Sequence, residues 1–434
     1  MSRKIWTKPL GVVALALCTV SAPLLADETK PDVTERAQAL VWGSGDVKPD
    51  PQAGLSMLED AAAQGDPEAA LAAGDLLLWG GPVAADRDRA VGYLEQAVEA
   101  GSWDAHRLLG KQLIGGWALP RDTARGVNLL KTQIAKGDAK AALILGEAYL
   151  YGTGLPRDYA KARDLFETAA EAGDATGLWK YGETLMWSQR DPKTAQAFLE
   201  RAGAAGVDGA YATLAEGAMY GYLGGGKASR AKFDGYAKAA RAAGNERIEV
   251  LDATRRIWGI SMRGDGKQAV AQLREAAEAG NKTAARYLVG LLRDGNSYNV
   301  RRDPKGAADF LEAHSDLFTP EERENYAMTI RVARHRHDAD FAPLAGEIAP
   351  ARAKMNAAEA RDLFKANPRL AVYMIQKDLA DKGLYRGPLD GFAGRGTLRA
   401  MERACGTMPG DMACRDGVLA PEIVGAMLRE GWGS

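Results

Sequence analysis

The sequence predicts an all-α protein in which a right-handed α-solenoid of about eight two-helix repeats precedes a small three-helix domain. Glycines recur with a step close to 36 residues, and aspartates recur with a similar step in the first half of the chain. Apolar residues between them follow the spacing of one helix face. A period of this length is typical of arrays in which each repeat is one supersecondary unit. The recurring glycines are Gly65, Gly101, Gly137, Gly173, Gly206, Gly244 and Gly280.

Residues 1–26 are predicted to be a cleaved secretory signal. Basic residues open the chain, and residues 10–20 form an apolar run. That run is too short to span roughly 30 Å of hydrocarbon, which favours a cleaved signal over a membrane helix. Cys18 leaves open a lipoprotein or a retained anchor. Cleavage predicts a periplasmic protein without a membrane span, in a Gram-negative cell envelope.

The charge balance argues against a nucleic-acid partner. The chain has 56 Lys and Arg residues against 57 Asp and Glu residues, whereas a nucleic-acid footprint needs a marked basic excess. Only four histidines occur, and none belongs to a recognisable metal-binding motif. We therefore expect no metal ion and no cofactor.

The stretch 148–174 indicates that each repeat is a pair of antiparallel helices. Gly152 follows an apolar-periodic run, where a left-handed helix stop needs no Cβ. Asp158 can cap the next helix, because its carboxylate accepts the free N–H groups of the first turn. Apolar residues then trace one helical stripe as far as Gly173. One such pair cannot bury its apolar face alone, so neighbouring pairs must stack.

An aromatic residue recurs directly before the glycine that ends the first helix of a repeat. We favour the interpretation that these rings pack between adjacent repeats as part of the core. The alternative is an exposed ladder that stacks on sugar rings or on side chains of a partner. The residues are Trp42, Trp79, Tyr151, Tyr220 and Trp258, with Trp187 before a serine instead.

This pattern resembles the Sel-like repeat, a close relative of the tetratricopeptide repeat. The resemblance is carried by the Gly-x-Gly after the first helix, the capping Asp, and the Ala-Ala-Glu-Ala-Gly-Asp that ends the second helix. It covers roughly residues 35–315 and implies a repeat solenoid over residues 27–333. It also implies protein partners, bound in the concave face of the solenoid.

The repeat pattern stops at residues 334–365, and we expect a linker there. The segment is charged and contains proline. His335 and His337 lie close to Asp338 and Asp340, but alternating His and Arg residues on a polar segment favour a solvated face over a metal site.

Residues 366–434 are predicted to form the small domain. Apolar spacing indicates a helix that stops at Gly383, a tight turn at residues 388–391, and a second helix that opens at Thr397. The segment resembles the three-helix peptidoglycan-binding-like domain. It departs from that family at Phe392-Ala393 and at Ala404-Cys405. The motif residues are Gln376, Leu379, Gly383, Tyr385, Asp390, Gly391, Gly394 and Thr397.

The chemistry of their side chains divides the residues of this domain into a loop-structural set and a ligand-facing set. Gln376, Asp390, Gly391, Gly394 and Thr397 form the structural set, because a carboxylate before glycine can accept backbone N–H groups and hold a turn. The candidates for peptidoglycan binding present rings or guanidinium groups to sugars or carboxylates. They are Tyr385, Arg386, Phe392 and Arg395.

Two cysteines remain once the signal is removed. Cys405 and Cys414 form an even pair in an oxidising compartment, so we predict a disulfide between them. The alternative is two buried or idle thiols.

The sequence favours a binding protein over an enzyme. No nucleophile-elbow or zinc-protease motif occurs, and the Ser-x-x-Lys at Ser229 lacks the companion motifs of penicillin-recognising enzymes. We expect an exported scaffold that binds protein partners through the solenoid and peptidoglycan through the terminal domain. The alternatives are a polysaccharide-binding or exopolysaccharide-assembly protein, and a cell-wall hydrolase whose site the sequence does not reveal.

Overall fold

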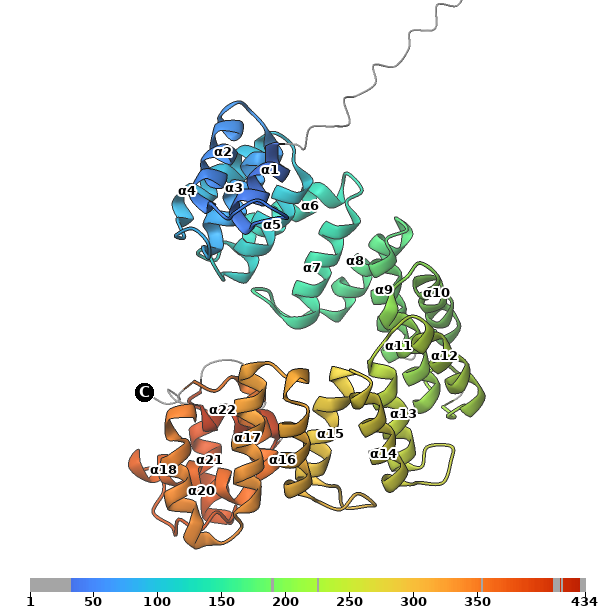
Figure 1. Ribbon diagram of the computed structural model, residues 1–434, viewed down its shortest axis with the longest axis vertical. Coiled ribbons are helices and arrows are strands. Elements are labelled where there is room, and N and C mark those ends of the chain that lie inside the picture. The colour runs from blue at the N-terminus through green and yellow to red at the C-terminus, as the bar shows by residue number, and fades with distance from the viewer. Residues whose placement is uncertain are drawn as a thin grey trace, which may run out of the picture. The chain divides into compact units, whose positions relative to one another are not determined.

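The computed structural model describes residues 33–188, 191–224, 226–352, 354–408, 414 and 417–429. The predicted signal, residues 1–26, lies outside this part of the chain. Within the described residues every regular element is a helix, apart from one isolated β-bridge between Ser44 and Val47 (Figure 1). The all-α prediction is therefore confirmed. The chain divides into two compact units, residues 1–158 and 159–434.

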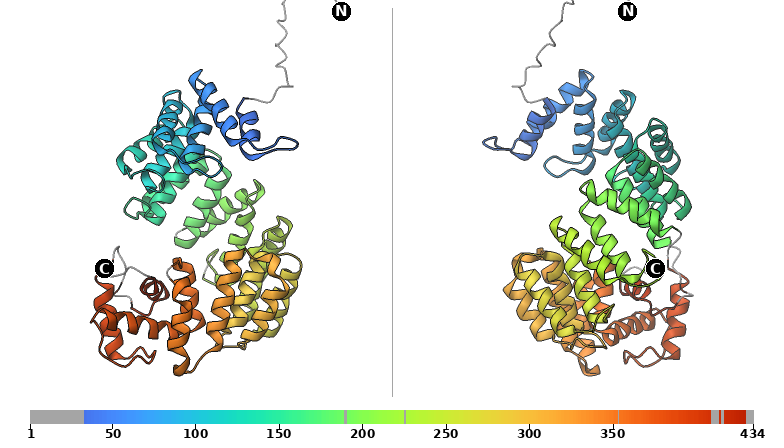
Figure 2. Two further views of the ribbon diagram at one scale, coloured as in Figure 1. Left: turned by 60° about the vertical axis from the view of Figure 1, so that its left-hand side comes forward. Right: turned by 90° about the vertical axis from the view of Figure 1, so that its right-hand side faces the viewer.

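Within the described residues, eight helix pairs follow one another from Val33 to Ala313, which confirms the expected number of repeats. We call the odd-numbered member of each pair the first helix and the even-numbered member the second helix. Figure 2 shows the later helices, α13 to α17, side by side, and each contacts the next. The pairs are α1 (Val33–Trp42) and α2 (Pro51–Ala63), α3 (Pro67–Trp79) and α4 (Arg87–Glu99), α5 (Trp103–Gly115) and α6 (Thr123–Ile134), α7 (Ala139–Tyr151) and α8 (Tyr159–Glu171), α9 (Ala175–Ser188) and α10 (Pro192–Ala204), α11 (Asp208–Tyr220) and α12 (Arg230–Ala242), α13 (Arg247–Trp258) and α14 (Gly266–Glu278), and α15 (Lys282–Asp294) and α16 (Pro304–Ala313).

Side-chain capping explains where the second helices begin. Asp50, Asp86 and Asp122 stand immediately before α2, α4 and α6, and each carboxylate accepts the N–H of the third helical residue at 3.0, 3.2 and 3.0 Å, respectively. Such a cap satisfies one of the backbone donors that a helix start leaves free. The first helix α7 ends as predicted at Gly152, whose φ of +72° is left-handed.

The core of each unit lies between successive helices and consists mainly of leucine and alanine. In the first unit Leu77 of α3 and Leu94 of α4 are almost completely buried. A Cβ on Gly74 would lie 2.8 Å from Leu94 Cγ, so glycine is what allows α3 and α4 to approach. In the second unit Leu288 and Phe310 occupy the equivalent place between α15 and α16. The apolar face of one pair is thus covered by its neighbours, which stabilises the array only as a stack.

A polar helix, α17 (Pro320–Arg334), follows the last pair and packs against α15 and α16. It begins with a capping box. Thr319 Oγ1 accepts the N–H of Glu322 at 3.2 Å, and Glu322 Oε2 accepts the N–H of Thr319 at 2.9 Å. Near the other end of α17, Val332 belongs to the core of the helices that follow.

The structure departs from the linker expected over residues 334–365. The segment forms a short 3₁₀ turn, then α18 (Phe341–Arg352) and α19 (Ala357–Ala366). Phe341, Leu344 and Ile348 lie on one face of α18 and are buried in the same core as the helices beyond residue 366. The spacing of these apolar residues favours a helix despite the charged residues and the proline. Pro350 falls near the end of α18, where its missing N–H disrupts few backbone hydrogen bonds.

Residues beyond 366 form the three expected helices, α20 (Pro368–Asp381), α21 (Arg395–Cys405) and α22 (Pro421–Leu428). They share one core with α18 and α19, so the terminal domain is larger than predicted. Cys405 and Cys414 are joined by a disulfide, with Cα atoms 6.0 Å apart. The bridge ties the end of α21 to residue 414.

Candidate functional site

The aromatic residues at the ends of the first helices are exposed, so the interpretation that they pack in the core is wrong. In α3, Leu77 and Leu78 fill the core, and Trp79 projects beyond it. A helix turns about 100° per residue, so the residue after a buried pair leaves the apolar stripe. We call this set the aromatic row. Its members and their exposed fractions are Trp42 (66%), Trp79 (56%), Tyr151 (59%), Trp187 (46%), Tyr220 (41%) and Trp258 (54%).

The third repeat supplies its ring from a different position. Gly115 stands where the other repeats have an aromatic residue, and Trp117, two residues later, is exposed instead. A Cβ on Gly115 would lie 2.6 Å from the Trp117 ring, so glycine makes room for it. The Lys111 ammonium lies 6.0 Å from the centre of that ring. Sequence reasoning missed Trp117 because it lies outside the period.

Two further tyrosines extend the aromatic row in the second unit. Tyr222 contacts the Trp187 ring edge-on, with ring centres 5.3 Å apart, and lies 5.7 Å from Tyr220. Tyr298 stacks on Trp258 with an angle of 12° between the rings. First helices of successive repeats contact one another in this unit, so these rings sit on neighbouring elements. The tyrosines follow the helices in loops of variable length, which is why no periodic signal marks them.

Acidic side chains lie one helical turn before several members of the aromatic row. Asp75 stands four residues before Trp79, and Glu183 stands four residues before Trp187. Desolvation raises the pKa of both carboxyls above the ordinary value, and the neighbouring indoles oppose that shift. Glu216 precedes Tyr220 in the same way, but it is paired with Arg247.

The terminal domain carries a second candidate site, a surface cavity of about 420 Å³. Of the predicted peptidoglycan-binding residues, Tyr385, Arg386 and Phe392 line it and Arg395 does not. Tyr385 is only 8% exposed and belongs to the core, so it presents little surface to a ligand. The lining residues are Leu384, Tyr385, Arg386, Gly387, Pro388, Asp390, Phe392, Gly394, Gly396, Thr397, Arg399 and Arg403.

Gln376 holds the loop that forms one wall of this cavity. Its side chain is fully buried, and its Oε1 accepts the N–H groups of Asp390 at 3.1 Å and of Gly391 at 2.8 Å. Its Nε2 donates to Asp390 Oδ1, to the Phe392 carbonyl and to Thr397 Oγ1 at 3.0–3.1 Å. Gly391 has a left-handed φ of +71°, and a Cβ there would lie 2.4 Å from the Arg369 carbonyl. The predicted structural set therefore makes one hydrogen-bonded loop, opened at the start of α21 by Gly394.

Unpaired guanidinium groups give the cavity a positive character. Arg386 and Arg399 are exposed, and neither forms an ion pair within the described residues. The hydrogen bond from Gln376 lowers the pKa of Asp390, so this carboxylate stays charged, but it faces the loop and also accepts the N–H of Phe392 at 2.9 Å. The Arg369 guanidinium lies over the Phe392 ring at 4.0 Å. The cavity therefore combines an aromatic face with free cationic donors, which suits a carboxylate ligand.

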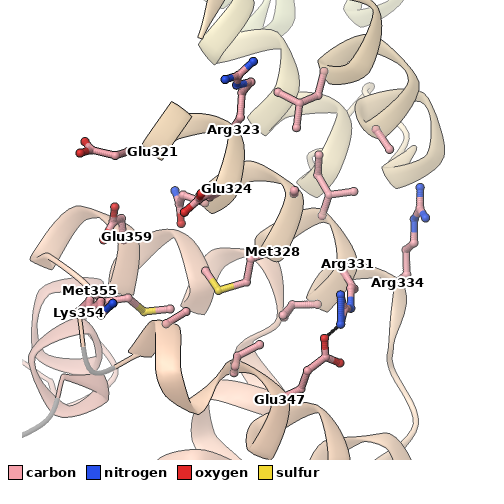
Figure 3. Close-up of a pocket in the computed structure, with 18 of the residues that line it drawn as sticks. Glu321, Arg323, Glu324, Met328, Arg331, Arg334, Glu347, Lys354, Met355 and Glu359 are labelled. Atoms are coloured by element: carbon pink, nitrogen blue, oxygen red, sulfur yellow. Dashed lines mark ion pairs between the residues drawn. The ribbon is translucent and has the colours of Figure 1, made fainter. Parts of the chain in front are cut away.

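A larger cavity, of about 1170 Å³, lies where α17, α18 and α19 meet the last repeat. Figure 3 shows Met328 and Met355 in this cavity, with the ion pair of Arg331 and Glu347 at one side. The sequence did not reveal this cavity, because two of the helices that line it, α18 and α19, lie in the segment expected to be a linker. Its rim carries acidic and basic residues in similar number and favours no ligand charge.

The described residues contain no group of three or more His, Cys, Asp or Glu side chains placed to hold a metal ion. None of the described helices combines the length and apolar character needed to cross a bilayer. The Ser-x-x-Lys pattern is part of a helix start: Ser229 caps α12 by accepting the N–H of Lys232 at 3.4 Å. Lys232 donates from Nζ to Gln196 Oε1 at 3.1 Å.

Solved structures with a similar arrangement have low sequence identity to this chain. A protective antigen of uropathogenic Escherichia coli with an SLR fold is 20% identical, with 81% of this chain and 79% of that chain covered and a TM-score of 0.44. A Sel1 repeat protein from Oxalobacter formigenes is 23% identical, with 67% and 84% covered and a TM-score of 0.45. At these identities and TM-scores the likeness supports no conclusion about function. Curated proteins give no match.

The Sel1 repeat family model matches four segments of the chain, residues 37–66, 67–102, 139–174 and 177–207. The matched segments coincide with helix pairs of the array and contain four members of the aromatic row. The match thus supports a Sel1-like repeat protein, with the repeats identified between residues 37 and 207.

Proposed function

We propose that this chain is a non-catalytic scaffold that binds protein partners through the aromatic row. The observation that carries the proposal is the exposure of an aromatic residue at the same helix end in successive repeats. Monomeric proteins bury most large rings, and protein interfaces are enriched in Trp and Tyr that anchor a partner. Where first helices contact one another, as α11 and α13 do, neighbouring rings offer more than one anchor to a partner. The Sel1 repeat match supports this reading, because such arrays serve as interaction surfaces.

A pull-down from envelope extracts tests the scaffold. The triple variant Trp79→Ala, Trp187→Ala, Trp258→Ala should recover far less partner than the unaltered protein, since each anchor contributes about 2 kcal/mol. The control is Trp103→Ala with Tyr159→Ala, two exposed rings at helix starts outside the row. Equal recovery by the triple variant and the unaltered protein would refute the role of the aromatic row. Equal loss in the control would show a general effect of removing surface rings.

We further propose that the protein works in the periplasm and associates with peptidoglycan through the cavity of the terminal domain. Export rests on the sequence of residues 1–26, and the disulfide suits an oxidising compartment. In the cavity, Arg386 and Arg399 would pair with carboxylates of the stem peptides, and the Phe392 ring would stack on a sugar.

Sedimentation with insoluble peptidoglycan sacculi tests this second part. Arg386→Ala with Arg399→Ala should leave the protein in the supernatant. Arg36→Ala with Arg301→Ala, at two exposed arginines that form no ion pair with any described residue, should not. The whole chain is used, because α18 and α19 share the core of the terminal domain and a chain cut near residue 360 would break it. Failure of the unaltered protein to sediment would end the peptidoglycan proposal. Release of soluble wall fragments would favour a hydrolase instead.

Polysaccharide binding is the second candidate function. It is favoured by the stacked pair of Trp258 and Tyr298, since broad exposed rings suit sugar faces as well as protein side chains. Binding of soluble glycan oligomers that is lost with Trp258→Ala would support it over a protein partner.

A further inference from the structure

A surface cavity of about 650 Å³ lies at the start of α14, close to α12 and α13 (Figure 1). We call it the α14 cavity. Among the described residues that line it, Asp265 alone is acidic, and its carboxylate caps α14 by accepting the N–H of Gln268 at 2.9 Å. Four cations from separate elements give the cavity a marked positive excess. They are Arg230 of α12, Arg256 of α13, Arg263 of the loop that follows α13, and Lys267 of α14.

Most of this positive charge is not neutralised by the protein itself. Arg230 pairs with Asp234 at 3.6 Å, whereas the other three cations form no ion pair within the described part of the chain. The Arg256 guanidinium donates to the side-chain oxygens of Gln268 at 2.7 Å and Gln272 at 3.3 Å. These neutral amides orient the guanidinium and leave its charge in place. The remaining two cations are exposed to solvent.

The equivalent place in another repeat has a different charge. A cavity of about 510 Å³ lies at the start of α4, beside the end of α3. The charges in its wall are balanced, because two acids and two bases line it, and one of the bases, Arg89, is paired with Glu59. The four residues are Asp86, Arg87, Asp88 and Arg89. The repeat geometry therefore forms a cavity in both places, while the excess of cations belongs to the α14 cavity.

The α14 cavity adjoins the stacked rings of Trp258 and Tyr298. Asn299 lines the cavity and directly follows Tyr298, and its Nδ2 donates to the Ile257 carbonyl at 2.8 Å. Gly264 also lines the cavity, and a Cβ there would lie 3.2 Å from Tyr298 Cε1, so the cavity wall lies against this ring. A partner segment that uses Trp258 as an anchor therefore passes close to the cations.

We propose that the α14 cavity receives an acidic segment of the protein partner, whose aspartate or glutamate side chains pair with the cations beside the Trp258 anchor. This inference rests on the proposed protein-binding function and adds the chemistry of the partner. Carboxylates form charge-assisted hydrogen bonds with guanidinium and ammonium groups. Cations on separate elements suit acids that are carried on separate flexible side chains. A basic segment would be repelled, and a neutral one would leave the charge uncompensated.

Nuclear magnetic resonance of the Trp258 indole N–H tests the inference on the whole chain. Trp258→Phe assigns the signal, which reports on the α14 cavity and not on the cavity of the terminal domain. The probe is a capped peptide of alternating glutamate and alanine, at low salt to limit screening. The comparison ligands are the same peptide with lysine for glutamate, and an oligogalacturonate as an acidic glycan. The glutamate peptide should shift the signal, the lysine peptide should not, and the oligogalacturonate should bind more weakly.

Charge-neutral variants then isolate the cations of the cavity. Arg263→Gln with Lys267→Gln should weaken binding of the glutamate peptide about fivefold, since each removes one exposed charge–charge contact. The matched control is Arg87→Gln with Lys193→Gln, at two exposed cations in the first turns of α4 and α10 that form no ion pair with any described residue. The control removes the same net charge and should change the affinity by less than twofold.

Three results would overturn the inference. The Trp258 signal could stay in place with the glutamate peptide, the site variant could bind no more weakly than the control variant, or the oligogalacturonate could bind more tightly than the peptide. The last result would assign the cavity to an acidic glycan. None of these outcomes decides the scaffold itself, because the loss of the natural partner on removing the rings is measured separately in the pull-down.

Discussion

Replacing Gln376 by leucine removes the brace of the cavity loop while keeping most of the side-chain volume. The amide makes five hydrogen bonds with Asp390, Gly391, Phe392 and Thr397, all at 2.8–3.1 Å. Some partners keep another bond: Phe392 O still accepts from Thr397 Oγ1, and Asp390 Oδ1 still accepts from the Phe392 N–H. The N–H groups of Asp390 and Gly391 lose their acceptor.

The expected cost follows from these two donors. A donor left without an acceptor on folding costs about 1–3 kcal/mol, and the added apolar burial of leucine offsets part of the sum. We therefore expect Gln376→Leu to destabilise the loop by about 2–4 kcal/mol. Hydrogen exchange followed by mass spectrometry on peptides covering residues 384–398 measures the opening locally. Exchange there should accelerate about 30-fold or more.

Gln133 provides a matched control in another part of the chain. It is also fully buried, but neither its Oε1 nor its Nε2 has a hydrogen-bond partner within the described residues. Gln133→Leu should therefore leave stability unchanged or raise it by about 1 kcal/mol. Unchanged exchange in the loop of Gln376→Leu, or equal destabilisation by the two variants, would refute the reasoning.

Three further predictions concern stability. Reducing the Cys405–Cys414 bridge should lower the melting temperature of the terminal domain by several degrees, because a loop of this length contributes about 2–3 kcal/mol; calorimetry with and without reductant checks it. Phe166→Ala, at a side chain with no exposed surface in α8, should cost about 3–5 kcal/mol in urea unfolding, and a loss below 1 kcal/mol would contradict the packing. The lowered pKa of Asp390 contributes stability that is present above the ordinary value of 3.8 and is lost as the pH falls through the folded-state value. Asp390→Asn should therefore flatten the acid limb of the stability curve of the terminal domain, and an unchanged acid limb would show that Asp390 does not brace the loop.

The array could be predicted because the residues that start and stop its helices act over short distances along the chain. Asp50 and Asp86 cap helices through contacts three residues away, and Gly152 stops a helix through its own backbone. Such signals act over one turn of chain and need no knowledge of distant neighbours. The loop of the terminal domain could also be predicted from the sequence, because Gln376 and Asp390 belong to the motif that resembles the peptidoglycan-binding-like domain.

Residues whose environment comes from other helices were assigned less well. Tyr385 was expected to face a ligand, but its hydroxyl donates to the Pro388 carbonyl at 3.0 Å and its ring joins the core. Phe341 was placed in a linker, but it fills the core of the terminal domain. A periodic pattern of three apolar residues among charges is too short to distinguish a docked helix from a solvated segment.

The sequence alone determined the helical class, the repeat length and the capping and stop residues of the array, because these depend on interactions within a few residues. Only the tertiary structure decided that Trp79 and Trp187 are exposed and that residues 341–366 belong to the terminal domain. The physical reason is that burial and charge compensation are set by whichever side chains the neighbouring helices bring, and the spacing along one helix does not contain that information.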